Sequence, residues 1–267
     1  MTEPRYTVNC SILLKDRPLP ERFAAVHAAG LDAVELWWPF ATPNPPREEI
    51  DALVAALQAN QVQLTGLNFD AGDMGAGWRG LVSVPSRAAD FQANLDAVTL
   101  IGELTGCRAF NALYGNRQEG VDPAAQDYLG AQHLADAARA VGRIGGTVLL
   151  EPVSGAPAYP LLTVADVLGV MDRVAAEHGV TNIGLLLDVY HLSVNGDDVP
   201  AGIETARQRI AHVQIADSPG RGAPGTGELP LGAWIDNLQA GGYPGWIGLE
   251  YVADGDPNPF AWLAKGF

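Results

Sequence analysis

Eight short apolar segments recur along the chain, and longer segments with helical spacing separate them. Several of the apolar segments carry almost no polar residue, which is typical of strands buried on both faces of a parallel sheet. Between the third and fourth segments, Phe91, Leu95, Val98, Ile101 and Leu104 fall on one face of a helix. This alternation predicts an α/β fold with a parallel sheet. The eight segments read YTVNCSILL, AVELWW, VQLTGLNF, RAFNALY, TVLLEPV, IGLLLDVY, HVQIAD and WIGLEYV.

Eight strand–helix units in 267 residues match the size of a (β/α)8 barrel, or TIM barrel. A doubly wound sheet is the alternative, but it requires a glycine fingerprint after the first strand, and SILLKDRPLP contains none. No linker, low-complexity tract or shift of composition divides the chain. We therefore expect residues 1–267 to form a single TIM-barrel domain with a short final helix, because only PFAWLAKGF follows the last strand.

The charge balance restricts the partners of the chain. Its formal net charge is −15, from 16 Lys and Arg against 31 Asp and Glu. Such a chain repels phosphate backbones and anionic bilayers, so neither nucleic acid nor membrane is expected as a partner. A small anionic substrate needs only a local positive site and remains allowed. The oligomeric state is open, and a homo-oligomer is compatible with the sequence.

Cysteine usage and the N-terminal sequence favour a cytoplasmic protein. Cys10 and Cys107 provide no disulfide framework, which suits a reducing compartment. The opening MTEPRYTVNC lacks the charged and apolar regions of a signal peptide. No apolar run approaches the roughly 20 residues that a membrane span requires.

Polar residues stand where four consecutive predicted strands end. Glu151, Asp188 and Glu250 close the fifth, sixth and eighth apolar segments, and Gln214 lies within the seventh. In a TIM barrel the carboxyl ends of the strands meet at one mouth, where the active site lies. Each acid taken singly could instead cap a helix or form a surface ion pair. The same placement in four successive strands favours a shared site.

Three carboxylates in one small volume repel one another and take up protons unless a cation balances them. Oxygen-rich ligation suits Mg²⁺ or Mn²⁺ better than zinc. The sequence therefore predicts a divalent-metal site at the barrel mouth.

Several motifs of the chain resemble those of the hydroxypyruvate isomerases, which belong to the xylose-isomerase-like TIM-barrel group of sugar isomerases and epimerases. The resemblance covers nearly the whole chain in one colinear order. In the wider group the third metal ligand is often His; Gln214 departs from that pattern but matches the hydroxypyruvate isomerase branch. The motifs are EPV at 151, DVYH at 188, HVQIAD at 212, PGRGAPGTGE at 219–228, GLNFDAGDMGAGWRG at 66–80, VELWWPF at 34–40 and GWIGLEY at 245–251.

The resemblance implies a metal-dependent isomerase that interconverts hydroxypyruvate and 2-hydroxy-3-oxopropanoate through an enediolate. It implies that Glu151 and Glu250 are both the acid/base pair and metal ligands, and that Asp188 and Gln214 complete the ligand set. Carboxylates beside the reacting carbons can carry the proton.

Five further residues are expected to contact the substrate. We place His191 on the loop after the sixth strand, and in the wider group the matching histidine contacts a substrate oxygen. Arg221 lies between glycines in the loop after the seventh strand, where a guanidinium can bind a carboxylate with two hydrogen bonds. Arg79 in GWRG is its competitor for that role. Asn68 and Asn111, in the third and fourth apolar segments, are expected to line the pocket.

Other polar and aromatic residues allow two interpretations. Glu35 and His212 can face the pocket or form part of the core, since a buried carboxylate needs a partner. Trp37, Trp38 and Trp78 can form an apolar wall around a small substrate or pack ordinarily. The glycine-rich stretches around residues 72–80 and 220–227 lack nucleotide-binding contexts and predict loops over the barrel mouth.

Three alternatives to a hydroxypyruvate isomerase remain. A related isomerase or epimerase could act on a longer acid sugar such as a 2-oxo-tetronate. A metal-dependent endonuclease of the same barrel group would need a histidine-rich metal cluster and a basic groove, which five histidines and the acidic charge oppose. A barrel that binds sugar without catalysis would not need acids at 151, 188 and 250.

Overall fold

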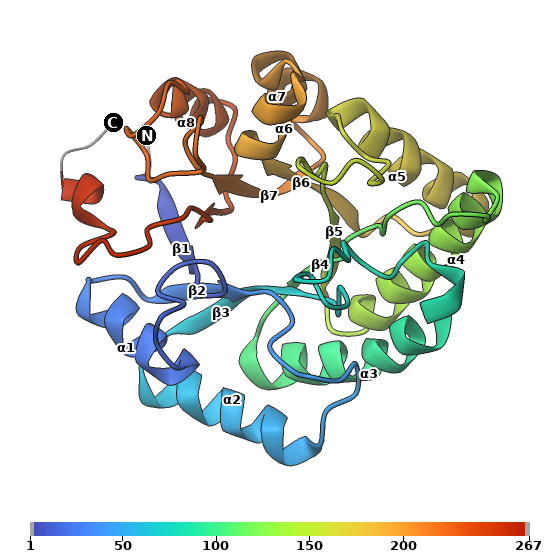
Figure 1. Cartoon of the computed structure of the whole chain (residues 1–267), viewed down its shortest axis with the longest axis horizontal. Helices are drawn as coiled ribbons and strands as arrows, with labels where there is room; N and C mark the ends of the chain where they lie inside the picture. The colour runs from blue at the N-terminus through green and yellow to red at the C-terminus, as the bar shows by residue number, and fades with distance from the viewer. Residues whose placement is uncertain (1–2, 265–267) are drawn as a thin grey trace.

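A computed structural model describes residues 3–264 of the chain, and its eight strands close into one parallel barrel (Figure 1). Each strand pairs with the next in sequence order, and the last pairs with the first. The predicted TIM barrel is confirmed, and the doubly wound sheet is not formed. The strands are β1 (Arg5–Asn9), β2 (Ala33–Leu36), β3 (Gln63–Asn68), β4 (Ala109–Asn111), β5 (Thr147–Leu150), β6 (Ile183–Asp188), β7 (Ile210–Ile215) and β8 (Trp246–Leu249).

Helices form a ring around the strands (Figure 1). All six residues of β6 are buried, as expected for a strand that has barrel interior on one face and helices on the other. None of the helices in residues 3–264 is long and apolar enough to cross a membrane. The α-helices are α1 (Leu19–Ala28), α2 (Arg47–Ala59), α3 (Ala88–Thr105), α4 (Pro123–Gly142), α5 (Val164–His178), α6 (Val189–Asn195), α7 (Val199–Ala206) and α8 (Leu231–Ala240), with short 3-10 helices η1 (Pro85–Arg87) and η2 (Ala261–Ala264).

The apolar face predicted between the third and fourth strands is the buried face of α3. Phe91, Leu95, Val98 and Ile101 are at most 8% exposed. The helix ends at Gly106, whose φ of 81° lies in the left-handed region that favours glycine.

The first strand covers only the beginning of the apolar segment YTVNCSILL. It ends at Asn9, because the Asn9 side chain accepts a hydrogen bond from the Ser11 N–H (3.0 Å) and its carbonyl accepts one from Leu13 (3.0 Å). These bonds turn the chain, so residues 11–14 of the apolar segment lie outside the strand.

The connection from β6 to β7 contains two helices, α6 and α7. Asp188 ends the strand and also caps α6, accepting a hydrogen bond from the His191 N–H (3.0 Å). His191 therefore lies in the first turn of a helix and not on a loop as predicted. After β8 the described chain forms η2, in keeping with a short final helix; residues 265–267 lie outside the described part.

Candidate active site

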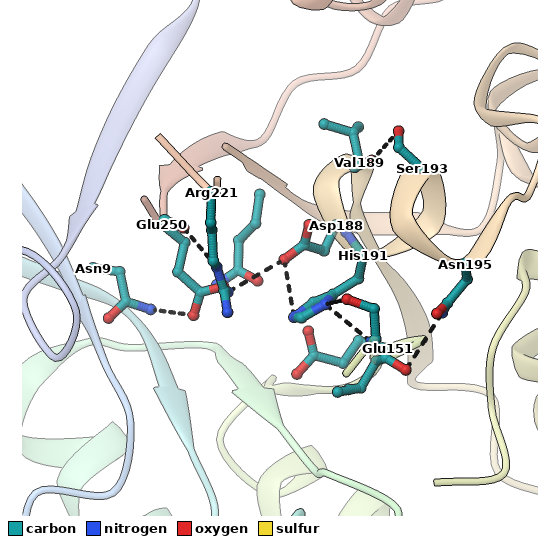
Figure 2. A network of polar contacts seen from close by, with 12 residues as sticks. Asn9, Glu151, Asp188, Val189, His191, Ser193, Asn195, Arg221 and Glu250 are labelled. Atoms are coloured by element: carbon teal, nitrogen blue, oxygen red, sulfur yellow. Dashed lines mark hydrogen bonds and ion pairs between the residues drawn. The ribbon is translucent and has the colours of Figure 1, made fainter. Parts of the chain in front are cut away.

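The four polar strand-end residues predicted as a site lie side by side at the mouth of the barrel. Asp188 is the partner of Gln214 in the β6–β7 register, and Gln214 is the partner of Gly248, two residues before Glu250. All four side chains belong to residues at most 6% exposed. Figure 2 shows the acid cluster, which we define as Glu151, Asp188 and Glu250, gathered with His191 and Arg221.

Burial makes the acid cluster hard to ionise. It raises the pKa of Glu151 well above its usual range, and the charges of Glu250 and Asp188 raise it further. It also raises the pKa of Asp188, against the lowering effect of Arg221. The pKa of Glu250 rises to about 7 for the same reason, again opposed by Arg221. Three carboxyls that resist carrying negative charge together are a site for additional positive charge.

The donor atoms fit a divalent cation. A carboxylate oxygen of Asp188 and one of Glu250 lie within 4.8 Å of each other and of a ring nitrogen of His191. The Oε1 atom of Gln214 is buried and has no hydrogen-bond partner among the described residues. A carbonyl oxygen of this kind is a ligand for hard cations such as Mg²⁺ and Mn²⁺.

Glu250 is held by donors that were not predicted from the sequence. Its Oε1 atom accepts hydrogen bonds from Asn9 Nδ2 (2.9 Å) and Trp37 Nε1 (2.9 Å), and its Oε2 atom pairs with Arg221. Asn9 is the last residue of β1, so the strand-end pattern that identified the acids could have identified it too. Trp37 was expected as an apolar wall of the pocket or as ordinary packing, and its indole N–H gives it a polar role as well.

Arg221 lies inside the site. Its Nη2 atom is 3.9 Å from Asp188 Oδ2 and also contacts Glu250, and its guanidinium stands 5.2 Å from the centre of the Tyr190 ring. Figure 2 shows Arg221 between Glu250 and Asp188. In this position it balances part of the acid charge and remains 21% exposed at the mouth.

The loop that carries Arg221 is held by a buried carboxylate. Asp217 accepts hydrogen bonds from the N–H groups of Ser218 (2.9 Å), Gly225 (2.9 Å) and Leu229 (3.0 Å). The Arg221 carbonyl accepts a further bond from Val252 (2.7 Å). Asp217 was not among the predicted site residues, although it follows β7 much as Glu151 and Glu250 follow their strands.

His191 presents one nitrogen to the acid cluster. Its Nδ1 atom accepts the Ser154 N–H (3.0 Å) and lies 2.7 Å from Ser154 Oγ, while Nε2 lies 3.7 Å from Asp188 Oδ2. Burial, and next the charge of Arg221, lower the pKa of His191 to about 3, so the ring is neutral. A neutral ring that accepts at Nδ1 carries its proton on Nε2, toward the acids.

Comparison with known proteins places the chain in a family. A Streptomyces coelicolor protein named "Putative hydroxypyruvate isomerase" is 48% identical over 99% of this chain and 97% of its own length. A 2-oxo-tetronate isomerase of Cupriavidus necator is 31% identical over 93% of this chain and 92% of its own. The family described as xylose isomerase-like TIM barrel matches residues 23–266. The chain belongs to the hydroxypyruvate isomerase family of these barrels.

The protein is thus an isomerase, and a solved relative shares its fold closely. The crystal structure entitled AP endonuclease, family 2, from Brucella melitensis is 29% identical, covers 98% of this chain and 99% of that one, and superposes with a TM-score of 0.88. The activity in that title belongs to the Brucella protein.

The remaining predicted site residues of this isomerase differ in their hydrogen-bond partners. Asn111 donates from Nδ2 to Glu151 Oε1 (2.8 Å), and Asn68 is its buried partner in the β3–β4 register. Arg79 donates to the carbonyls of Met74 (2.9 Å) and Trp78 (2.7 Å). Its charge reaches His191 and contributes to the lowering of that pKa. These hydrogen bonds of Arg79 lie within its own loop, whereas Arg221 contacts Glu250.

Glu35 and His212, whose place the sequence left open, lie next to the candidate metal ligands. Both are buried, and His212 Nε2 lies 2.6 Å from Glu35 Oε2. Gln214 donates from Nε2 to Glu35 Oε1 (2.6 Å). Glu35 and His212 are therefore buried inside the barrel, and Glu35 contacts the candidate ligand Gln214 directly.

Proposed function

We propose that this isomerase interconverts hydroxypyruvate and 2-hydroxy-3-oxopropanoate and depends on Mg²⁺ or Mn²⁺. One observation carries the proposal: three buried acids stand at the carboxyl ends of barrel strands, and Gln214, the register partner of Asp188, has a buried carbonyl oxygen without a hydrogen-bond partner among the described residues. The 48% identical relative named for hydroxypyruvate supports the choice of substrate.

Glu151, Asp188, Gln214 and Glu250 would hold the divalent ion. When bound, that ion would supply positive charge that polarises the substrate carbonyl and balances the acids. The oxygen-only set favours a hard ion over zinc.

The acids carry the proton in this proposal. A carboxylate of Glu151 or Glu250 removes a proton from C3 of hydroxypyruvate, which is adjacent to the C2 carbonyl, and leaves an enediolate. The proton returns at C2, while the hydroxyl proton of O3 moves to O2. The products of these transfers are a C3 aldehyde and a C2 hydroxyl, so atoms and electrons balance.

Two further side chains orient the substrate. His191 has its Nε2–H directed toward the acids, where it can donate to a substrate oxygen. Arg221 can bind the substrate carboxylate with its remaining N–H groups, because only part of its donor set is used by Glu250 and Asp188. Arg79, Asn68 and Asn111 are proposed as the wall of the same pocket.

The test is deuterium exchange followed by NMR. Metal-loaded protein is incubated in D₂O with hydroxypyruvate, with a 2-oxo-tetronate and with free sugars. Hydroxypyruvate should take up solvent deuterium and form the aldehyde product, and chelated protein should do neither. Exchange into the 2-oxo-tetronate alone would assign the longer substrate, as the Cupriavidus relative's name allows.

A further inference from the structure

A buried carboxylate lies beside Gln214, and the proposed reaction does not use it. Glu35 of β2 accepts three hydrogen bonds, at Oε2 from His212 Nε2 (2.6 Å) and at Oε1 from Gln214 Nε2 (2.6 Å) and Asn9 Nδ2 (3.2 Å). Its side chain is 4% exposed. Glu35 thus joins β1, β2 and β7 inside the barrel.

The barrel leaves room for this carboxylate at two glycines. A Cβ atom on Gly248 would lie 2.8 and 2.9 Å from the two carboxylate oxygens of Glu35, and 2.8 Å from Gln214 Cγ. A Cβ atom on Gly66 would lie 3.2 Å from Glu35 Cβ. The two strands that face Glu35, β3 and β8, therefore have glycine at the positions next to it. The side chains of Glu35 and Gln214 fill the space that a side chain on Gly248 would need.

The contact with Glu35 determines which end of the Gln214 amide faces the site. An amide has a donor end and an acceptor end, whereas a carboxylate only accepts. Glu35 therefore engages the nitrogen of Gln214. The oxygen does not bond Glu35, and it is one of the buried side-chain atoms that have no hydrogen-bond partner among residues 3–264. With the amide reversed, two N–H groups would face the cation site and no ligand atom would be available from β7.

We propose that Glu35 is a positioning residue that selects the oxygen of Gln214 as a cation ligand, and that His212 and Asn9 hold Glu35 in place for it. The inference rests on the proposed function, since it concerns the same divalent ion. It explains how an amide, which is a ligand at only one of its ends, can serve at this position.

Mn²⁺ affinity of the purified protein tests the proposal without reference to turnover. In Glu35→Gln the new amide presents N–H groups as well as an oxygen, so it no longer requires the nitrogen of Gln214. We expect the Mn²⁺ dissociation constant, measured by calorimetry, to rise roughly 10- to 100-fold, the usual effect of removing a group that orients a ligand. Circular dichroism should remain that of the wild type.

A compensating variant separates orientation from general disturbance. In Glu35→Gln/Gln214→Glu the carboxylate and the amide exchange places, so the charge of the pair is unchanged. A carboxylate offers oxygen at both ends and cannot be reversed. Mn²⁺ affinity should return to within a few-fold of the wild type.

Thr7→Val is the matched control. Thr7 is buried in β1, two residues before Asn9, and its hydroxyl pairs with Thr65 (2.6 Å) and not with Glu35. This variant also removes a buried polar contact of the barrel, yet it should leave Mn²⁺ affinity unchanged. If Glu35→Gln does not fold, Glu35→Asp replaces it, because the shortened side chain loosens the contact with Gln214 and should weaken Mn²⁺ binding in the same direction.

The possible results distinguish the positioning role of Glu35 from the metal dependence of the isomerase. Wild-type affinity in Glu35→Gln, or no recovery in the double variant, overturns the positioning role while the isomerase proposal stands. A wild-type protein that binds neither Mn²⁺ nor Mg²⁺ overturns the metal dependence itself, and the positioning role with it.

Discussion

Glu151 and Glu250 occupy equivalent strand ends but have different hydrogen-bond partners. Glu250 accepts from Asn9, Trp37 and Arg221, so both of its oxygens face donors. Glu151 accepts from Asn111 at Oε1 alone among the side-chain bonds of the described residues. The same substitution should therefore have different consequences at the two positions.

Replacement of either acid by Gln should lower turnover by roughly 10² or more, because the variant cannot carry the proton. Glu151→Gln should keep a melting temperature close to the wild type. Glu250→Gln should also melt earlier, since its new N–H₂ group must face one of the donors that now hold the carboxylate. Turnover and thermal unfolding measure the two effects. A Gln variant with near wild-type turnover would mean that its acid is only structural.

Arg221→Lys should weaken binding of hydroxypyruvate by about 1.5–3 kcal/mol, the scale of a hydrogen bond to a charged group. An ammonium cannot reproduce the two parallel bonds of a guanidinium on a carboxylate. The dissociation constant can be measured on metal-loaded protein by competition or calorimetry.

Neutral hydroxyaldehydes of similar size serve as the control ligands for Arg221→Lys. They lack the carboxylate and should lose much less affinity. Equal losses for both ligand types would mean that Arg221 acts on the acid cluster and not on the substrate carboxylate.

At the scale of an element, the loop between β7 and α8 depends on Asp217. The two carboxylate oxygens of Asp217 accept three backbone N–H groups from the beginning and the later part of this loop. Arg221 lies in the chain between these groups. Asp217→Asn leaves one oxygen and turns an N–H₂ group toward a backbone donor. We expect a loss of about 1–3 kcal/mol in the free energy of unfolding, the cost of an unsatisfied buried group. Hydrogen exchange across residues 218–229 should accelerate, and kcat/KM for hydroxypyruvate should fall.

Asp198→Asn provides the matched control for this loop. Asp198 caps α7 by accepting the Ala201 N–H (3.0 Å), and Asn caps a helix about as well as Asp. Its stability and its kcat/KM should stay close to the wild type. If the two variants behaved alike, Asp217 would have no special role in placing Arg221.

At the scale of the whole molecule, the acid cluster links metal, protons and stability. Burial raises the pKa of each of its carboxyls, that of Glu250 to about 7. Between the usual pKa range of a carboxyl and pH 7, the metal-free folded chain therefore keeps protons that the unfolded chain has already lost. Folding in this pH window is accompanied by proton uptake. By linkage, the stability of the metal-free protein should fall across that window.

Divalent metal should reverse this trend. Chelation should abolish turnover, and Mg²⁺ or Mn²⁺ should restore it and raise the melting temperature, because the ion binds the folded state. Calorimetry near pH 6.5 in buffers of different ionisation enthalpy should detect protons released on Mn²⁺ binding. Full turnover in excess chelator, with no metal in elemental analysis, would contradict the metal dependence.

The barrel and the strand-end acids could be predicted because their signals are local. Each strand is a short apolar run, and each acid directly follows or ends its run. The partners of those acids could not be predicted in the same way. Glu35 meets His212 across 177 positions, and Asn9 meets Glu250 across 241. Such contacts depend on barrel closure, which no local pattern records. The placement of His191 was wrong because Asp188 both ends a strand and caps a helix.

The β1–β8 seam has a consequence for how the barrel opens. Glu250 directly follows the strand that completes the ring, and its partner Asn9 ends the strand that began it. A local opening of this seam would separate the acid from Asn9 while the other seven strand pairs stayed intact. Loss of catalytic competence would then precede loss of the sheet, so enzyme assays would detect ring opening before spectroscopy does.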